Sequence, residues 1–291
     1  MASELFKAGD LTAVIGDNAG EGAHRPGYNG IWSLAHRAEQ TNPFVPLYAG
    51  FNLEHIFDGE TLDVRGGNRI FFEPRNAPMT LRRLSDSAAE LHQPPTPTFF
   101  LESWTRFDFS PPDAIDITFR CRAHRHAFKR GYIGLFWASY INGPEDKGMH
   151  FRGPGGWEQL CTPAHNAMST VRHADDSMPV TFAQGHRECL YASFSPLRFR
   201  EPFFHGYVRG QVLAFMFDSA SGIRFSHSPS GGGANKDSDS QNPAWDFQMI
   251  IPKYDVMKDY GFRARIIYRE RCPRSAVAAE YDKWRKSLPR S

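Results

Sequence analysis

Hydrophobic and polar positions alternate most regularly in residues 114–126, AIDITFRCRAHRH. The odd-numbered positions from Ile115 to Cys121 are apolar, and the even-numbered positions are polar. Because successive side chains of a strand point to opposite faces, this pattern predicts a β-strand with one face in a core. The opposite face would carry charged, hydroxyl and imidazole groups: Asp116, Thr118, Arg120, Arg122, His124 and His126.

Similar short patterns fill much of the chain. Prolines and an aspartate at 111–113 separate residues 98–109 from the strand just described, which predicts an antiparallel hairpin. Residues 131–141 are apolar on both parities, as expected of a central strand. Further strands are predicted at many places along the chain, among them residues 69–73, 203–209 and 211–218.

One amphipathic helix is predicted over residues 275–288. Val277, Tyr281, Trp284 and Leu288 follow one another at spacings of four, three and four, which places them on one helical face. Ser275 is the predicted N-cap. The whole pattern predicts a mainly β fold, an antiparallel two-sheet β-sandwich formed by residues 1–291 as a single domain, with this helix packed on it.

Composition narrows the functional classes. Aromatic residues make up 14% of the 291 residues, which favours strands and surfaces that stack on sugars. The formal net charge of +2 gives no electrostatic signature of nucleic-acid binding. Apolar runs of membrane-spanning length and an apolar N-terminal leader are absent from the sequence, so we expect a cytoplasmic protein that does not enter membranes.

The polar face of residues 114–126 is the first candidate site. Arg122 and His124 are candidates for substrate binding, since a guanidinium group can hold hydroxyls or a carboxylate. His126 is a candidate acid or base. His124 and His126 have the spacing of two ligands to one divalent metal, with a third ligand from elsewhere. A solvated strand face would have the same pattern.

Glu54 and His55 form a second candidate pair within apolar surroundings. Burial raises the pKa of a carboxyl and moves it towards the range used in acid–base catalysis. In a regular strand the two side chains would point to opposite faces, so only one of them would face a given cleft. A buried polar pair that fixes two loops is the structural alternative.

Two other segments combine aromatic and polar groups. His150 and Arg152 lie near Trp157, and a ring beside hydrogen-bond donors is suited to a pyranose. The polar segment 226–247 is a candidate binding loop. It contributes His227, Trp245 and Asp246, and Trp137 is a further candidate stacking ring. Surface loops fixed by buried tryptophans are the structural alternative.

Several segments resemble a group of uncharacterised bacterial proteins of this length: YNGIWSLAHR, NPFVPLYAGFNLEHIFDG, GLFWASYINGPEDKGMHFRG, LRFREPFFHG and SPSGGG…NPAWDFQMIIPKY. The strand-rich plan with scattered His, Glu, Arg and Trp is also similar to the galactose-mutarotase-like β-supersandwich. That resemblance implies a sugar site on a concave sheet, with a histidine and a glutamate as acid and base. No epimerase motif matches residue by residue, so it assigns no catalytic residue.

The leading hypothesis is a carbohydrate-active enzyme of the epimerase, isomerase, lyase or hydrolase type. Glu54, His55, His126 or His150 would transfer protons on a small sugar or an oligosaccharide. The sequence requires no cofactor, and a divalent metal is an open option. The alternatives are a non-catalytic sugar-binding module, a structural or assembly protein with an oligomer interface, and a metal-dependent isomerase or lyase.

Overall fold

The predicted strand at residues 114–126 is β10 (Ala114–Ala123) in a computed structural model that describes residues 2–62, 64–65, 68–183, 190–229 and 242–289. It pairs with β9 (Leu101–Ser110) along its whole length, which confirms the predicted hairpin. On its other side lies β20 (Asp259–Glu270). The strand ends at Ala123, so His124 and His126 follow it instead of extending its polar row.

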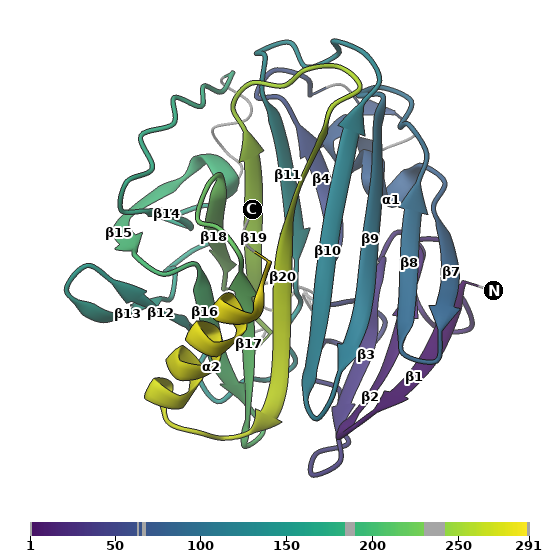
Figure 1. Cartoon of the computed structure of the whole chain (residues 1–291). Coiled ribbons are helices and arrows are strands. Elements are labelled where there is room, and N and C mark those ends of the chain that lie inside the picture. The colour runs from purple at the N-terminus through teal and green to yellow at the C-terminus, as the bar shows by residue number, and fades with distance from the viewer. Residues whose placement is uncertain (1, 63, 66–67, 184–189, 230–241, 290–291) are drawn as a thin grey trace.

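β10 lies within a nine-stranded antiparallel sheet (Figure 1). In spatial order its strands are β13 (Gly156–Leu160), β12 (Met149–Gly153), β16 (Phe203–Val208), β17 (Gln211–Phe217), β20, β10, β9, β8 (Ala88–Gln93) and β7 (Thr80–Ser85). The β16–β17 pair confirms the hairpin predicted near residue 210.

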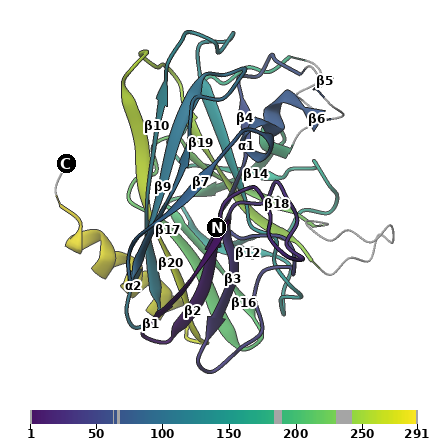
Figure 2. The same cartoon turned by 90° about the vertical axis from the view of Figure 1, so that its right-hand side faces the viewer.

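A six-stranded sheet packs behind the nine-stranded one (Figure 2). Its order is β15 (Phe194–Phe199), β14 (Thr170–His173), β18 (Ile223–Ser228), β19 (Ala244–Ile251), β11 (Ile133–Ala138) and β4 (Asn52–Phe57). All its pairs are antiparallel except β14 with β15. Two smaller sheets consist of β1 (Ser3–Ala8), β2 (Leu11–Gly16) and β3 (Gly30–His36), and of β5 (Val64–Arg65) and β6 (Asn68–Arg69).

The predicted C-terminal helix is present as α2 (Arg274–Ser287), which lies on the outer side of the nine-stranded sheet (Figures 1 and 2). It buries Val277, Tyr281 and Trp284, as its spacing predicted. The N-cap is Pro273, with no side-chain cap, in place of the predicted Ser275. Among the described residues, no helix is both long and apolar enough to cross a lipid bilayer.

The strand predicted over residues 69–73 is wrong in most of its length. Only Arg69 is in a strand, and the chain continues as the 3-10 helix η1 (Ile70–Phe72) and the short helix α1 (Glu73–Asn76). Proline is compatible with a first helical turn, and Pro74 occupies that place. The Glu73 carboxylate accepts hydrogen bonds from the backbone N–H groups of Thr98 and Phe99 at 2.6 and 3.1 Å.

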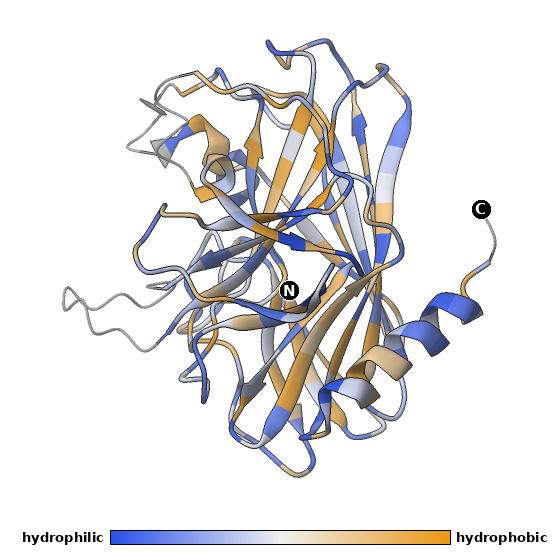
Figure 3. Ribbon diagram, turned by 90° about the vertical axis from the view of Figure 1, so that its left-hand side faces the viewer, coloured by the Kyte–Doolittle hydropathy of each residue, from blue (hydrophilic) through white to orange (hydrophobic). Residues whose placement is uncertain are grey.

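The main core lies between the two large sheets. Trp137 of β11 stacks on Phe247 of β19 with ring centroids 4.8 Å apart, and it meets Phe119 of β10 edge-to-face. All three side chains are buried. Hydrophobic residues are correspondingly concentrated in the strands (Figure 3).

A second apolar cluster covers the outer face of the six-stranded sheet. It includes Phe57, Phe136 and Tyr140, together with Phe71 of η1 and Tyr191 of the 3-10 helix η3 (Leu190–Ala192). The six-stranded sheet is therefore covered on both faces, and polar side chains on its outer face are removed from bulk water.

Trp137→Ala tests the assignment of this ring to the core. We expect the substitution to lower the free energy of unfolding by about 3–5 kcal/mol, since it opens a cavity and removes four ring contacts. Denaturant unfolding provides the measurement, and Leu5→Ala, at an exposed side chain, is the control. A loss for Trp137→Ala no larger than that of the control would contradict the assignment.

Candidate functional site

A β-bulge in β4 brings Glu54 and His55 to the same side of the six-stranded sheet. Opposite β11, His55 pairs with Phe136 and Leu53 pairs with Trp137, so Glu54 is the extra residue. A bulge inserts one residue and breaks the alternation of faces. The prediction that the two side chains point to opposite faces is therefore wrong: Glu54 Oε1 lies 3.7 Å from His55 Nε2.

The Glu54 carboxylate is buried and held by two donors. The Tyr140 hydroxyl donates a hydrogen bond to Oε2 at 2.7 Å, and Arg75 of α1 donates to Oε1 at 3.2 Å. Burial raises the pKa of Glu54, while Arg75 and Tyr140 act in the opposite direction. Burial also keeps the pKa of Tyr140 well above its ordinary value, so this hydroxyl stays a donor. The carboxylate is thus fixed in one position beside the His55 ring.

The His55 imidazole is enclosed by aromatic rings. It stacks on Phe136 with centroids 5.0 Å apart, and Phe71, Phe72 and Tyr191 meet it edge-to-face at 4.7, 4.6 and 5.8 Å. These contacts restrict the rotation of the ring. Glu54 on one side and the aromatic rings around it therefore set both the orientation of His55 and its access to solvent.

His55 borders a cavity of about 310 Å³ on the outer side of the six-stranded sheet, which we call the His55 pocket. Its walls combine cationic, imidazole, amide and aromatic groups, and they consist of His55, Arg69, Phe71, Phe72, His165, Asn166, Leu190 and Tyr191. The second imidazole, His165, is exposed at the pocket, and its Nδ1 lies 2.8 Å from the Ser228 hydroxyl oxygen. The pocket thus presents two imidazoles to one small space.

Further polar groups are buried on the same face of the sheet. Asp246 of β19 accepts a hydrogen bond from the Ser139 N–H at 3.0 Å. Burial raises its pKa well above the usual value of 3.8, and the nearby Glu54 adds to the effect. Gln248 donates to the hydroxyls of Thr170 and Ser226 at 2.9 and 2.8 Å. The outer face of the sheet beside the His55 pocket therefore carries polar side chains although it is buried.

The polar row of β10 lies on the outer face of the nine-stranded sheet, on the other side of the sandwich. Arg122 donates to Asp259 at 2.6 Å, and His124 lies 2.7 Å from Glu102. His126 is exposed beyond the end of the strand. In the part of the chain that the structure describes, no three His, Cys, Asp or Glu side chains are grouped to hold a metal ion. Metal binding by His124 and His126 stays a prediction.

The group predicted around residue 150 lies on that same outer face, near the start of α2. His150 is buried, and its Nε2 lies 3.3 Å from Asp146 Oδ2. Its Nδ1 accepts a hydrogen bond from Arg274. Arg152 pairs with Glu201, and Trp157 packs beside α2. This group is separate from the His55 pocket.

Trp245 and His227, which were predicted to bind substrate, face the core instead. Trp245 is buried, and its indole N–H donates to the Lys147 carbonyl at 2.9 Å. His227 Nε2 lies 2.8 Å from the same oxygen, and its Nδ1 lies 2.8 Å from the Thr162 hydroxyl. With Trp137, these rings fix the interior and offer no stacking face to a ligand.

The structure therefore brings together Glu54, His55 and Asp246 out of the predicted residues. The pattern of the sequence did not indicate Arg69, Arg75, Tyr140, His165 or Tyr191. Arg75 follows Pro74 and lies just beyond the strand predicted over residues 69–73, and His165 lies in a stretch without periodicity. For Arg75, the only signal in the sequence was Pro74, which is typical of the first turn of a helix.

Known structures share this arrangement of strands. A putative aldose 1-epimerase from Escherichia coli K12 superposes with a TM-score of 0.50 at 9% identity, over 92% of this chain and 99% of that one. A galactose mutarotase-like protein from Lactobacillus casei gives a TM-score of 0.51 at 9% identity, over 92% of this chain and all of that one. The chain has the galactose mutarotase-like fold. This confirms the predicted resemblance in architecture.

At the level of sequence, neither a protein-family model nor a curated protein matches the chain. An identity of 9% shows a shared fold and leaves the site to be argued from its own residues.

Asp246→Asn tests the burial of this carboxyl. The folded state holds the proton more tightly than the unfolded chain, so the stability of the natural protein falls as pH rises from 3.8 towards the raised pKa. The fall is at most about 1.4 kcal/mol per pH unit. The amide keeps the acceptor for the Ser139 N–H but does not titrate, so this pH dependence should disappear. Urea unfolding across a pH series measures it.

Asp86→Asn is the matched control, since the Asp86 carboxylate is fully exposed. It should leave the pH dependence unchanged. The same pH dependence in Asp246→Asn as in the natural protein would show that Asp246 is ionised in the folded state.

Proposed function

We propose that the chain is an enzyme that binds a small sugar in the His55 pocket and transfers protons on it. The observation that carries the proposal is the position of His55, which borders the pocket while a buried carboxylate fixes its ring from behind. A base held in place by a second group is the usual arrangement for proton transfer.

The size and lining of the pocket support a monosaccharide or the terminal unit of a longer glycan. A volume of about 310 Å³ is at the lower end of ligand sites in proteins. Arg69 and Asn166 supply hydrogen-bond donors for hydroxyls, and Tyr191 supplies an apolar ring face. The names of the two structural neighbours, an aldose 1-epimerase and a galactose mutarotase-like protein, agree with this substrate class.

Two imidazoles at one pocket suit a reaction that needs an acid and a base together. In the interconversion of sugar anomers, a base removes the proton of the anomeric hydroxyl while an acid protonates the ring oxygen. The ring opens, rotates about one bond and closes again, so atoms and electrons balance without a further reactant. In this proposal His55 and His165 exchange these roles, and Glu54 stabilises the imidazolium form of His55.

His55→Asn tests the proposal in an anomer-interconversion assay. Polarimetry or NMR would follow freshly dissolved α-anomers of several aldoses, glucose and galactose among them. The natural protein should accelerate equilibration. We expect His55→Asn to lower the rate by about 10²-fold or more, which is typical of the loss of a general acid or base.

His165→Asn extends the test to an exposed position where folding is not at risk, and it should lower the rate as well. His124→Asn, the same change just beyond the end of β10 on the other side of the sandwich, should not. Thermal unfolding of each variant separates loss of chemistry from loss of fold. Saturable binding of aldoses without any turnover would favour a sugar-binding module, and equal rates in His55→Asn and the natural protein would refute the assignment.

A further inference from the structure

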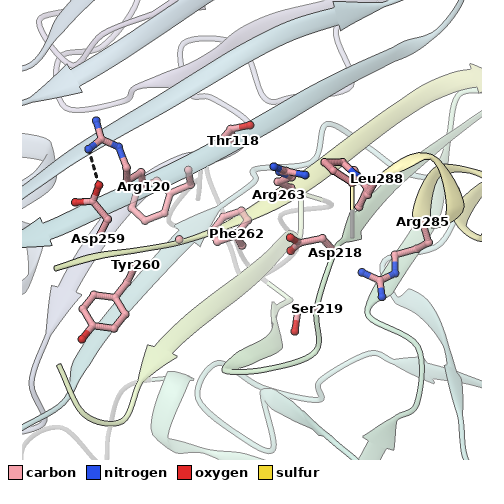
Figure 4. Close-up of a pocket in the computed structure, with 13 residues that line it drawn as sticks. Thr118, Arg120, Asp218, Ser219, Asp259, Tyr260, Phe262, Arg263, Arg285 and Leu288 are labelled. Carbon is pink, nitrogen blue, oxygen red and sulfur yellow. Dashed lines mark hydrogen bonds and ion pairs between the residues drawn. The ribbon is translucent and has the colours of Figure 1, made fainter. Parts of the chain in front are cut away.

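A second cavity lies on the opposite side of the sandwich from the His55 pocket. It measures about 720 Å³ and lies between β10, β20, the segment after β17 and the end of α2 (Figure 4). We call it the β20–α2 groove and define it by Thr118, Asp218, Ser219, Arg263, Arg285 and Leu288. It is more than twice as large as the His55 pocket, so it can accept more than one sugar unit.

Arginines on this face of the sheet are usually paired across strands. Arg265 of β20 lies opposite Asp116 of β10 and binds it with two hydrogen bonds of 2.8 and 2.7 Å. Arg269 pairs with Asp113 in the same way, and Arg120 with Asp259. These ion pairs neutralise the charge locally.

Arg263 departs from this rule. It lies two residues before Arg265 on the same strand. The residue opposite Arg263 is Thr118, a hydroxyl, whereas the residue opposite Arg265 is a carboxylate. Within the described residues, neither Arg263 nor Arg285 forms an ion pair. Both are exposed, and both line the groove from different elements (Figure 4). Two cationic forks thus remain available to an anion from outside.

Asp218 adds an acceptor to the same groove. Its backbone N–H donates to the Arg263 carbonyl at 2.9 Å, so the two residues are neighbours in the groove. Its Oδ1 atom is buried and has no hydrogen-bond partner among the described residues. The hydroxyls of Thr118 and Ser219 complete a surface that can both donate and accept.

We propose that the β20–α2 groove binds an acidic oligosaccharide, with a sugar carboxylate held by Arg263 and Arg285. Arg263 and Arg285 carry two positive charges against the one negative charge of Asp218, so the groove favours an anion. Asp218, Thr118 and Ser219 can hydrogen-bond to sugar hydroxyls, which a simple inorganic anion lacks. This site does not depend on the function proposed for the His55 pocket, because the two lie on different sheets.

Calorimetric titration at low ionic strength tests the proposal with three probes. These are a trisaccharide of galacturonic acid, the corresponding neutral galactose trisaccharide, and inorganic sulfate. We expect the acidic trisaccharide to bind at least about tenfold more tightly than either of the others, because only it satisfies both the guanidinium groups and the acceptors.

Arg263→Gln and Arg285→Gln should each weaken binding of the acidic trisaccharide by about tenfold, the scale of one charge-assisted contact. Arg82→Gln removes the same charge from an exposed position on β7 and should have no effect. Binding by His55→Asn should equal that of the natural protein. Equal affinity for sulfate or for the neutral trisaccharide, or unchanged binding in both groove variants, would overturn the proposal.

Discussion

Aromatic packing between the two large sheets determines which side of each strand can carry polar groups. Trp137, Phe247 and Phe119 fill the space between the sheets. The residues that alternate with them along the same strands must therefore face outward. On the nine-stranded sheet the outward-facing side chains of β16 and β17 pack under α2, whereas those of β10 and β20 form cross-strand ion pairs. On the six-stranded sheet the outer face lies under η1, α1 and η3, and its polar groups are buried. The two faces of the sandwich thus offer different chemistry, a small pocket lined by imidazole and aromatic rings and a larger charged groove.

The mainly β fold and several of its elements could be predicted from the sequence because local periodicity follows burial. The alternation from Ile115 to Cys121 predicted β10, and the apolar run around Trp137 predicted a central strand. The helical spacing of Tyr281 and Trp284 predicted α2. Each of these patterns lies within one element and needs no knowledge of its neighbours. The conformation of residues 69–73, in contrast, depends on the proline at position 74 and on the hydrogen bonds of Glu73 to residues 98 and 99.

The candidate site could be predicted only in part. Glu54 and His55 were recognised as a pair, but their common orientation depends on a bulge that is defined by pairing with β11. Arg75, Tyr140 and His165 come from separate segments that only the tertiary fold brings near β4. The same holds for the β20–α2 groove. That Arg263 lacks an ion-pair partner among the described residues can be seen only once its neighbour across the sheet is known to be Thr118.

The proposed chemistry depends on His55, fixed by Glu54, meeting a sugar in its pocket. The most direct measurement is a nuclear magnetic resonance titration of the histidine side chains with an aldose. We expect the imidazole signals of His55 and His165 to shift together and saturate, while those of His124 and His150, on the other side of the sandwich, stay in place. Saturating shifts confined to His124 or His150, with His55 unmoved, would contradict it.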